Sequence, residues 1–396
     1  MRFPGFEGEW EHQRMGDLGD FTKGAPLSKA DISDDGTPFI LYGELYTTYG
    51  EIIRSVTRRT NAETDNKYKS RNGDVIIPTS GETPEEIATA SCVMPEGVIL
   101  GGDLNIFRGQ KVDGRFLAYL IRHKASHRIA RIAQGVSIVH VSSFELRRVV
   151  VSIPSPHEQE KIVAFLDLLD ARITAQRKLV ELLKKHKKGV IEQIFGRRLS
   201  IGDNPEKWGI VKLRDLFKKV ARRNRDGIVK NVITNSAEYG LIPQRNFFDK
   251  SIAVDGNTDG YYVIRTGDFV YNPRKSIPAP FGPFNRYTGV DDGIISPLYT
   301  CLVLAGKANP DYLAWYFRST AWHRYVYDNG SQGARHDRVN MTDDLLFGIP
   351  VLLPPGNIQT WIADMLNSID ARVSDADKAL TQLETMKRGL LQQLFA

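Results

Sequence analysis

The chain has few of the residues that mark secreted, membrane or redox proteins. Its 396 residues include only two cysteines, Cys92 and Cys301, which allow no disulfide framework and lack the paired spacing of a zinc site. No stretch approaches the ~18 apolar residues that a membrane span requires, and the N-terminus MRFPGFEGEWEHQ has no apolar signal segment. We therefore expect a cytoplasmic protein whose cysteines are buried as small apolar side chains.

Signatures of catalysis are missing as well. The sequence contains no GxxxxGK[ST] nucleotide loop, no GxGxxG cofactor loop and no Asn/Asp-Pro-Pro-aromatic motif of amino-methyltransferases. HKASH (123–127) places two histidines one helical turn apart, but it lacks the glutamate of a zinc-protease motif, so a helix surface is the simpler interpretation. We expect no metal, no cofactor and no bond chemistry in this chain itself.

Length and charge set the class of protein. A chain of 396 residues with 41% hydrophobic content can bury a sizeable core and exceeds one ordinary domain, so two or more domains are expected. The net charge of +6 is a weak indication of a polyanionic partner, because clustered Lys and Arg release counterions when they bind phosphates.

Residues 157–196 and 357–396 form an ungapped internal repeat. A weaker echo joins WEHQRMGDL (10–18) to WGIVKLRDL (208–216), so the repeated unit is a half-chain with two shared ends and a divergent middle. Identical residues at positions 200 apart begin at Gln159, Ile162, Leu166, Asp170, Ala171, Arg172, Lys178, Leu183, Lys187, Gly189, Gln193 and Phe195.

Apolar residues in both copies follow the three-four spacing of a heptad seam. Each copy follows a proline and contains none, and the first ends at Gly196, a residue favoured just past a helix. The spacing predicts two long helices, within 153–196 and 353–396. Their predicted interface consists of Ile162, Leu166, Leu169, Ile173, Val180, Leu183, Ile362, Leu366, Ile369, Val373, Leu380 and Leu383.

Connectivity favours antiparallel pairing of these helices. A helix of about 38 residues is ~57 Å long, whereas the dozen or so residues between Gly196 and Trp208 reach only ~40 Å at full extension. A parallel partner would need the chain to return the whole length. We therefore expect an antiparallel coiled coil, with the two halves related by an approximate twofold axis.

The divergent middles, 1–152 and 197–352, show one order of elements. Strand-like runs precede one helical stretch in each half, followed by a glycine-containing loop and a last strand. The fold class is therefore α+β, with two β-rich domains joined by the long helices. Predicted strands are 38–42, 74–78 and 104–108 in the first half and 261–264, 267–271 and 297–305 in the second, and the predicted helices are 114–132 and 311–327.

Basic residues gather in clusters with aromatic and small polar neighbours. One cluster is usually a solvated surface, but several across paired domains favour nucleic-acid binding, because these side chains reach phosphates and base edges. The run KKHKK (184–188) is more simply a solvated helix face. The clusters are RSVTRRT (54–60), NKYKSR (66–71), VARRNR (220–225), YNPRKS (271–276) and ARHDR (334–338).

At this point the pattern resembles the specificity (S) subunit of type I restriction-modification systems. The likeness rests on the two W-x₇-L openings and on SIPSPHEQEKIVAFLDLLDARI with KKGVIEQIF, repeated as VLLPPGNIQTWIADMLNSIDARV with KRGLLQQLF. The second copy departs from the family pattern at Ile358, where the first has Glu158. The resemblance implies two target recognition domains, at 1–152 and 197–352, and two conserved helices, at 153–196 and 353–396.

The resemblance also implies partners and a non-catalytic role. Such a subunit would bind double-stranded DNA, two modification (methyltransferase) subunits and possibly restriction (endonuclease-translocase) subunits. Those partners would supply the S-adenosylmethionine, ATP and Mg²⁺ chemistry. Because the two middles differ, the target should be bipartite and asymmetric, with half-sites one to two helical turns apart given major-groove faces every ~34 Å.

Our candidate DNA contacts are the loops after each domain helix and the basic-aromatic clusters. Two rival hypotheses remain: a coiled-coil scaffold that presents two sugar- or peptide-binding domains, and a nuclease with an unrecognised site. The candidate residues are Tyr68, Lys69, Arg71, Ser137, His140 and Ser142 in the first domain, and Asn272, Arg274, Lys275, Arg335, His336 and Arg338 in the second.

Overall fold

A computed structural model describes residues 2–135, 138–196, 208–244, 258–330 and 337–395. The chain divides into two compact units, one of Met1–Arg177 with Lys378–Ala396 and one of Lys178–Asp377. Each unit combines a β-rich domain with part of each of two 40-residue helices, α7 (Pro156–Phe195) and α12 (Gly356–Phe395). The predicted α+β class with two long helices is confirmed.

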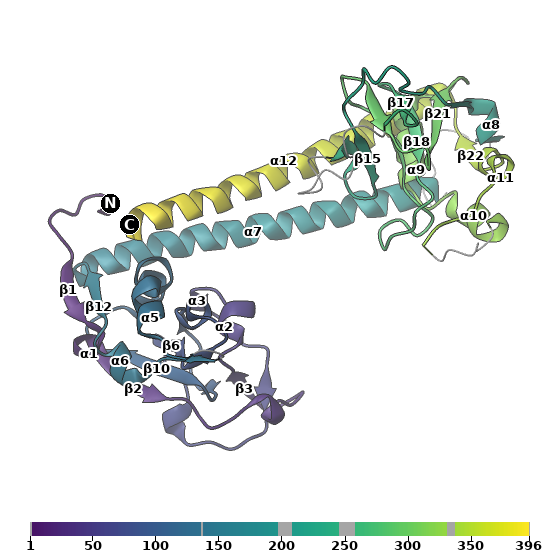
Figure 1. The fold of residues 1–396 in the computed structure, drawn as a ribbon. Coiled ribbons are helices and arrows are strands. Elements are labelled where there is room, and N and C mark those ends of the chain that lie inside the picture. The colour runs from purple at the N-terminus through teal and green to yellow at the C-terminus, as the bar shows by residue number, and fades with distance from the viewer. Residues whose placement is uncertain (1, 136–137, 197–207, 245–257, 331–336, 396) are drawn as a thin grey trace. The chain divides into compact units, whose positions relative to one another are not determined.

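The first unit is built on a five-stranded sheet in the order β2-β10-β6-β8-β4 (Figure 1). Its central strand β6 is buried along its whole length, because alternate side chains enter two different cores. Val75 and Ile77 join one core, and Ile76 joins the other. The strands are β2 (Gly19–Lys23), β4 (Ile52–Ile53), β6 (Asp74–Pro78), β8 (Ser91–Val93) and β10 (Leu104–Gly109).

Smaller sheets and short helices complete this domain. A three-stranded sheet joins β5, β3 and β9, and two-stranded ladders join β1 to β12 and β11 to β7. The strands are β1 (Glu11–Arg14), β3 (Thr37–Ile40), β5 (Arg59–Thr60), β7 (Ser80–Gly81), β9 (Ile99–Leu100), β11 (Val139–His140) and β12 (Val150–Ile153). The short helices are α1 (Met15–Leu18), η1 (Lys29–Asp31), α2 (Glu44–Thr47), η2 (Asn66–Tyr68), α3 (Pro84–Ile87) and α6 (Ser143–Leu146).

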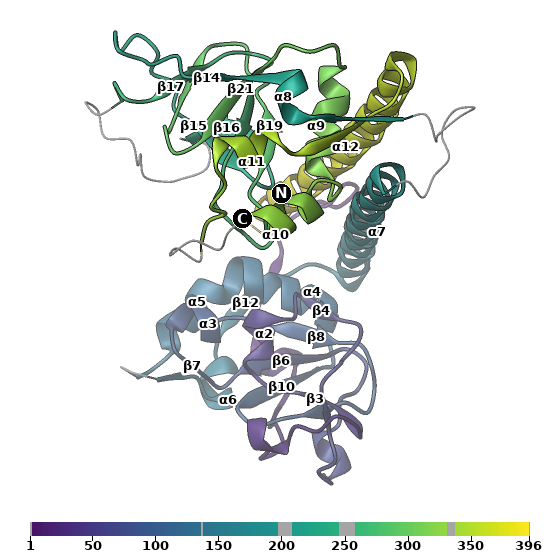
Figure 2. The ribbon, with the colours of Figure 1, turned by 90° about the vertical axis from the view of Figure 1, so that its right-hand side faces the viewer.

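The predicted helix over 114–132 is present as one helical stretch, which Figure 2 shows above the sheet. It consists of α4 (Gly114–Leu120), a π-helical segment (Ile121–Ala125) and α5 (Ser126–Ile132). The Asp113 carboxylate caps its start by accepting the Arg115 N–H at 2.8 Å, the role that acidic and amide side chains play at N-caps.

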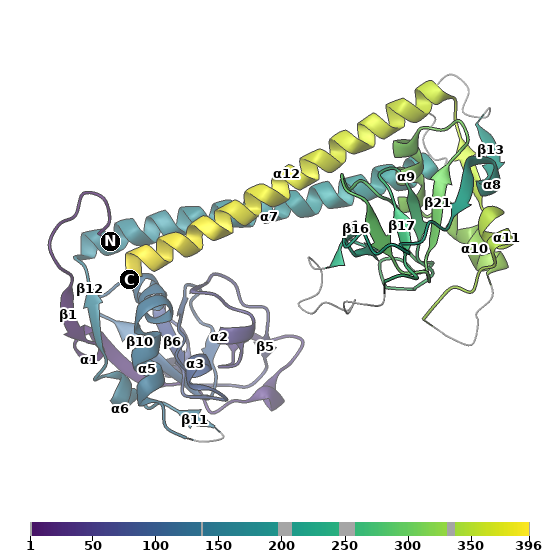
Figure 3. The same ribbon diagram turned by 45° about the horizontal axis from the view of Figure 1, so that its top comes forward.

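The second unit repeats this plan around a four-stranded sheet in the order β14-β21-β18-β19. Figure 3 shows β13 beside the short helix α8 at the edge of the unit. The strands are β13 (Gly209–Lys212), β14 (Phe217–Val220), β15 (Ile233–Ser236), β16 (Gly240–Pro243), β17 (Tyr262–Ile264), β18 (Phe269–Tyr271), β19 (Phe284–Arg286), β20 (Gly293–Ile295), β21 (Thr300–Leu304) and β22 (Pro350–Leu353). The helices are α8 (Leu213–Leu216), α9 (Pro310–Arg318), α10 (His323–Asn329) and α11 (Asp343–Phe347).

One helix prediction was wrong in this unit. The stretch 311–327 forms two helices, α9 and α10, instead of one. The break follows α9 at Ser319, whose extended backbone leaves the helical region and whose hydroxyl donates to the Tyr316 carbonyl at 2.6 Å. The Trp322 indole N–H donates to the Phe317 carbonyl at 3.1 Å, so side chains satisfy the carbonyls that a continuous helix would have used.

The long helices run antiparallel inside each unit. In the first unit, Asp170 pairs with Lys387 at 2.7 Å and Arg177 with Glu384 at 2.6 Å. As the residue number rises along α7, the number of its partner on α12 falls. The second unit shows the same direction through Lys184–Asp377 at 3.2 Å and Lys187–Asp370 at 2.7 Å. The predicted antiparallel pairing is confirmed in both.

The twelve predicted seam residues all lie away from solvent to some degree. Four of them, Leu183, Ile369, Leu380 and Leu383, are half-buried, and the other eight are buried. In each unit the first turns of one helix and the last turns of the other enter the core of the β-rich domain. The helices are therefore packed against the domains as well as against each other.

The identity of Gln159 and Gln359 in the repeat has a direct structural cause. The buried Gln159 carboxamide donates to the Pro154 carbonyl and accepts the Asp113 N–H, both at 2.9 Å. Gln359 makes the same two contacts, with the Pro354 carbonyl and the Asn309 N–H, both at 2.7 Å. Each glutamine therefore ties the start of a long helix to the start of the domain helix, and we refer to this arrangement as the glutamine clamp.

The residue before the clamp differs between the units. Glu158 is fully buried and pairs with Arg2 at 2.7 Å, whereas its counterpart Ile358 packs against the apolar core of the second unit. The departure from the family pattern at Ile358 therefore loses the contacts that Glu158 makes with Arg2 and with the Phe3 N–H, and it leaves the clamp in place.

Candidate nucleic-acid interface

The candidate residues of the second domain gather where β18 ends. The Lys275 N–H donates to the Asp337 carbonyl at 2.8 Å, and the Val339 N–H donates to the Pro273 carbonyl at 2.8 Å. These bonds align Arg274 opposite Arg338 in an antiparallel bridge. We call residues 273–275 with 337–339 the second-domain ladder. It brings Arg274, Lys275 and Arg338 onto one short piece of paired backbone.

The buried Asn272 side chain holds the backbone of this ladder in place. Its side chain is 6% exposed, its carboxamide oxygen accepts the Arg274 N–H at 3.0 Å, and its amide donates to the Asn235 carbonyl at 3.4 Å. Asn235 in turn accepts a hydrogen bond from the Asn285 amide at 2.7 Å. Buried amides are satisfied in pairs in this way, so Asn272 holds the backbone and is not available to a ligand in this state.

Two cations of the ladder share one carboxylate. Asp337 lies 4.0 Å from Arg274 and 3.8 Å from Arg338. The Arg274 side chain is 71% exposed and that of Arg338 32%, so both guanidinium groups reach solvent. Exposed pairs at these distances contribute little to stability, which leaves the two arginines able to exchange Asp337 for a phosphate or a base edge.

The first domain contains the same ladder with different side chains. The Val141 N–H donates to the Thr79 carbonyl at 2.9 Å, and His140 pairs with Ser80 where β11 meets β7. Each ladder begins just after a segment that carries a Gly-Asp pair near its start. These segments are NGDVIIP (72–78) and TGDFVYN (266–272). Counting from those Gly-Asp pairs, Ser80 and Gly81 stand where the second domain has Arg274 and Lys275. His140 corresponds to Arg338 because it pairs with Ser80 as Arg338 pairs with Arg274.

Sequence reasoning missed Ser80 and Gly81. The signal that locates them is the Gly-Asp pair shared by the two halves, since Gly73 and Gly267 both adopt positive φ, 89° and 94°, a conformation that favours glycine. An alignment anchored on these glycines places Ser80 opposite Arg274, although the two segments share little else.

The remaining first-domain candidates lie at the other end of β6. Arg71 precedes the strand, whereas Ser80 follows it, so the two ends are about 20 Å apart at 3.3 Å per residue. Tyr68 closes η2 and Lys69 follows it, and both are half-buried. The structure therefore does not bring Tyr68, Lys69 and Arg71 together with His140.

Asp74 orders the backbone at this end of β6. Its carboxylate accepts the Arg71 N–H at 2.9 Å and pairs with Arg108 at 3.3 Å. The second domain repeats the arrangement at Asp268, which accepts the Arg265 N–H at 2.8 Å and pairs with Arg222. Burial raises the pKa of both carboxyl groups, and the N–H and guanidinium contacts offset part of that rise. The repetition indicates a structural role for this end.

Of the other four candidates, Ser142 alone lies within the described residues. Ser142 caps α6: its hydroxyl accepts the Glu145 N–H at 3.3 Å and donates to the Glu145 carboxylate at 2.9 Å. Ser137, Arg335 and His336 lie outside the described residues. Whether any candidate contacts DNA stays a prediction.

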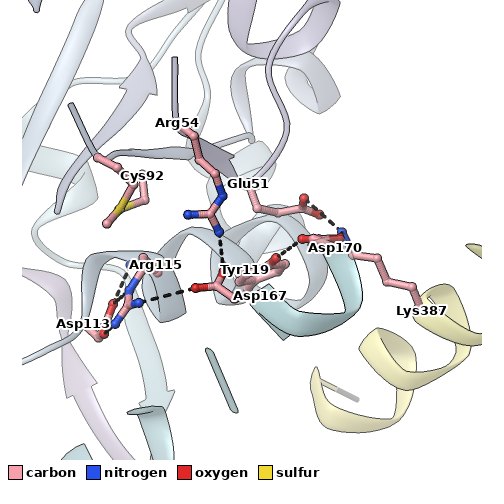
Figure 4. A network of polar contacts seen from close by, with 10 residues as sticks. Glu51, Arg54, Cys92, Asp113, Arg115, Tyr119, Asp167, Asp170 and Lys387 are labelled. Atoms are coloured by element: carbon pink, nitrogen blue, oxygen red, sulfur yellow. Dashed lines mark hydrogen bonds and ion pairs between the residues drawn. The ribbon is translucent and has the colours of Figure 1, made fainter. Parts of the chain in front are cut away.

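A polar network joins the first domain to the end of α12 within the first unit (Figure 4). Lys387 lies 2.7 Å from Asp170 and 3.6 Å from Glu51, and the Tyr119 hydroxyl donates to Asp170 at 2.7 Å. Burial would raise the pKa of Glu51, but the hydrogen bond to His123 and the charge of Lys387 outweigh it and lower that pKa to about 2.

HKASH lies on a helix surface as predicted, with both histidines exposed. The His123 ring also makes tertiary contacts: it lies 2.8 Å from the Glu51 carboxylate and stacks with Phe395 at a centroid distance of 6.2 Å. The sequence alone could not show this, because Glu51 and Phe395 are far from HKASH along the chain.

The described part of the chain holds neither a cluster of metal-ligand side chains nor an ionised thiol. No group of three or more His, Cys, Asp or Glu side chains is placed to hold a metal ion there. Cys92 and Cys301 are buried as expected, and burial raises the pKa of each thiol to about 12, which makes neither a nucleophile at neutral pH. No described helix combines the length and apolar character needed to cross a bilayer.

These features define a two-domain α+β protein in which paired helices carry two versions of one β-rich domain. A model of the family described as "Type I restriction modification DNA specificity domain" matches residues 7–184. The resemblance of the chain to specificity subunits of type I restriction-modification systems is confirmed.

Similarity to named relatives extends over nearly the whole chain. The putative type I restriction enzyme MjaX specificity subunit of Methanocaldococcus jannaschii is 23% identical, with 98% of this chain and 93% of the relative covered. The MjaVIII specificity subunit of the same organism is 24% identical, with coverages of 98% and 92%.

Solved structures share the fold. The S subunit from M. genitalium aligns with a TM-score of 0.55 and 12% identity, covering 98% of this chain and 96% of that one. A chain from work on the complex assembly and conformational transition of the type I R-M system aligns with a TM-score of 0.57 and 18% identity, with coverages of 98% and 97%. At these identities the likeness concerns the fold alone.

Proposed function

We propose that this chain is the DNA-reading subunit of a type I restriction-modification complex and performs no bond chemistry itself. Its target recognition domains, 1–152 and 197–352, would each read one half of a bipartite target, and the helices within 153–196 and 353–396 would connect them. The observation that carries the proposal is the pair of ladders. One backbone arrangement occurs twice and presents different side chains, so the two half-sites would differ.

The side chains of the ladders suit different tasks. Arg274 and Arg338 can each donate two parallel hydrogen bonds to guanine O6 and N7, or to a phosphate. Ser80 and His140 are smaller, polar and able both to donate and to accept. The second domain would therefore depend more on guanidinium contacts, and the first on hydroxyl, imidazole and backbone contacts.

The helices would dock the partners. We propose that two methyltransferase subunits bind along them, with restriction subunits joining, and that these partners supply S-adenosylmethionine, ATP and Mg²⁺ chemistry. Support comes from large apolar side chains that α7 leaves exposed with helical spacing, notably Leu168 at 73% and Leu182 at 55% exposure. Their counterparts on α12, Ser368 and Gln382, are polar, and α12 exposes Trp361 and Met386 instead, so the two docking faces would differ in their side chains.

Titrating the intact chain with random duplex DNA at rising salt tests the DNA-binding part. A DNA reader should lose affinity steeply as salt rises, because bound counterions are released from the phosphates. A scaffold for sugar- or peptide-binding domains should show weak binding with little salt dependence. Cleavage of DNA by the chain alone with Mg²⁺ would instead favour a nuclease and contradict the proposal.

Arg338→Ala tests the ladder itself. If Arg338 reads a base, its loss should cost about 1 to 3 kcal/mol and relax specificity at one position, measured on a library of duplexes with the assembled methyltransferase complex. Equal weakening for all sequences would assign it to a phosphate. Arg324→Ala is the matched control, because Arg324 is 82% exposed on α10 and pairs only locally with Asp328. Equal effects of the two variants would remove the ladder from the interface.

A further inference from the structure

Four ion pairs between α7 and α12 fall into two classes when each residue is compared with its counterpart 200 positions away. The outer pairs are Asp170–Lys387 and Lys187–Asp370, at 2.7 Å each. Each helix carries the same two residue types at these positions, Asp at 170 and 370 and Lys at 187 and 387. Exchanging the helices turns one outer pair into the other, so these pairs do not distinguish α7 from α12.

The inner pairs behave differently. Arg177 pairs with Glu384 at 2.6 Å in the first unit, and Lys184 pairs with Asp377 at 3.2 Å in the second. Position 177 is basic where 377 is acidic, and position 184 is basic where 384 is acidic. The charges of α7 are therefore reversed in α12 at both inner positions, although the apolar seam and the outer pairs are shared.

This reversal matters when a helix meets a second copy of itself. Two copies of α7 in the same register would place Arg177 of each against Lys184 of the other, two repulsive contacts. Two copies of α12 would place Asp377 against Glu384, again two repulsive contacts. The outer pairs would be kept in both cases, because Asp170 would meet Lys187. Of these four ion pairs, the two inner ones would separate correct from incorrect pairing.

We propose that the two inner ion pairs make α7 select α12 and reject a second copy of either helix. Charges that flank a heptad seam set partner choice in coiled coils more than they add stability. Each exposed pair contributes little, but changing two attractions into two repulsions should alter the preference by roughly tenfold or more. The selection would keep the two halves of one chain together when other copies are present. It does not depend on the proposed DNA-binding function.

A two-polypeptide version of the whole protein tests the proposal. Residues 1–196 and 197–396 are co-produced with different tags, and native mass spectrometry counts the mixed pairs against the two kinds of like pair. We expect mixed pairs to outnumber like pairs by roughly tenfold, whereas random association would give about equal numbers of mixed and like pairs. A random distribution would overturn the proposal.

A single substitution should reverse the choice. Lys184→Glu in the first polypeptide creates two attractions between like copies, each with Arg177, and one repulsion toward Asp377 of the correct partner. Like pairs of residues 1–196 should then rise to equal or exceed mixed pairs. Lys185→Glu is the matched control, because it makes the same charge change at the adjacent exposed position and should leave mixed pairs dominant. Equal distributions for both variants would contradict the proposal.

The intact chain provides a second measurement if the two polypeptides fail to assemble. Lys184→Glu and Asp377→Lys should each lower the melting temperature, and the double variant should recover most of the loss, as a charge-swapped pair does in a double-mutant cycle. Absence of recovery would show that the two residues do not act on each other, and the selection mechanism would fail with them.

Discussion

In both units the glutamine clamp joins the start of a long helix to the start of a domain helix through the same two bonds. The ladders at the far ends of β6 and β18 also share their backbone bonds, yet one carries Ser80 and His140 where the other carries Arg274 and Arg338. The clamp needs its side chain, because glutamine itself makes the bonds. The ladder needs only backbone atoms, so its outward side chains are free to differ.

A second difference concerns charge beside the helices. In the first unit one cation, Lys387, lies between two carboxylates, Asp170 at 2.7 Å and Glu51 at 3.6 Å. In the second unit one carboxylate, Asp370, lies between two cations, Lys187 at 2.7 Å and Arg318 at 4.0 Å. Both units keep the duplicated Lys–Asp pair, but the first domain adds a negative charge, Glu51, and the second adds a positive charge, Arg318. The Lys–Asp pair is therefore compatible with an additional charge of either sign.

The largest expected difference between the units lies in the helix seam. Leu169 is 7% exposed, whereas its counterpart Ile369 is half-buried. Leu169→Asp places a carboxylate in an apolar site and should cost about 3 to 5 kcal/mol and abolish methyltransferase binding. Ile369→Asp should cost about half as much. Denaturant unfolding and capture of the methyltransferase subunit measure both effects.

Leu168→Asp is the control for this experiment, because Leu168 is 73% exposed and its substitution should barely change the free energy of unfolding. It should still weaken methyltransferase binding, because Leu168 belongs to the exposed face of α7 that we propose docks that partner. Normal unfolding and normal assembly of Leu169→Asp would contradict the coiled-coil interface.

The elements that followed from the sequence are those with local, periodic causes. The heptad seam that includes Leu166 and Leu169 predicts a helix. The apolar run at 74–78 predicts a buried strand, which the structure confirms as β6. What could not be derived depends on distant partners. The break at Ser319 requires Trp322 to fold back on Phe317, and His123 acquires its role from Glu51 and from the last turn of α12.

The candidate site was predictable only in outline. The clusters around Arg274 and Arg338 lie 64 residues apart in the numbering, and nothing in either segment alone indicates that they pair. By contrast, Asn272 looked like a binding residue because it stands in a basic cluster, and its buried hydrogen bonds show a supporting role. The basic clusters in the sequence indicated the region of the site. Backbone pairing in the structure shows which side chains lie together there.

An intermediate effect should come from the glutamine clamp, and here the two units should agree. Gln159→Leu and Gln359→Leu keep the side-chain volume but leave a buried N–H and a buried carbonyl without partners. Each should lower the free energy of unfolding by about 1 to 3 kcal/mol, measured in urea. The exposed Gln382→Leu serves as control and should change it by less than about 0.5 kcal/mol. Costs that differ strongly between the two clamps would break the equivalence of the units.

The smallest effect is a pH dependence confined to the first unit. The pKa of Glu51 is about 2 in the folded chain, below its ordinary value of 4.5. A carboxyl group with a lowered folded pKa stabilises the fold above the ordinary value, and that contribution is lost as the pH falls from about 4.5 toward 2. Glu51→Gln keeps a hydrogen-bonding oxygen for His123 but removes the charge opposite Lys387, so it should lower stability by about 1 kcal/mol at pH 6.

The gap between Glu51→Gln and the wild type should therefore close on acidification, as followed by thermal unfolding at several pH values. Glu85→Gln is the control, since Glu85 is an exposed carboxylate lining the same cavity as Glu51 and should show no gap to close. A gap for Glu51→Gln that stays constant from pH 6 to pH 3 would mean that shape or hydrogen bonding, and not charge, makes Glu51 matter. The difference between the sites of Lys387 in the first unit and Asp370 in the second would then lie in their geometry and not in their charge.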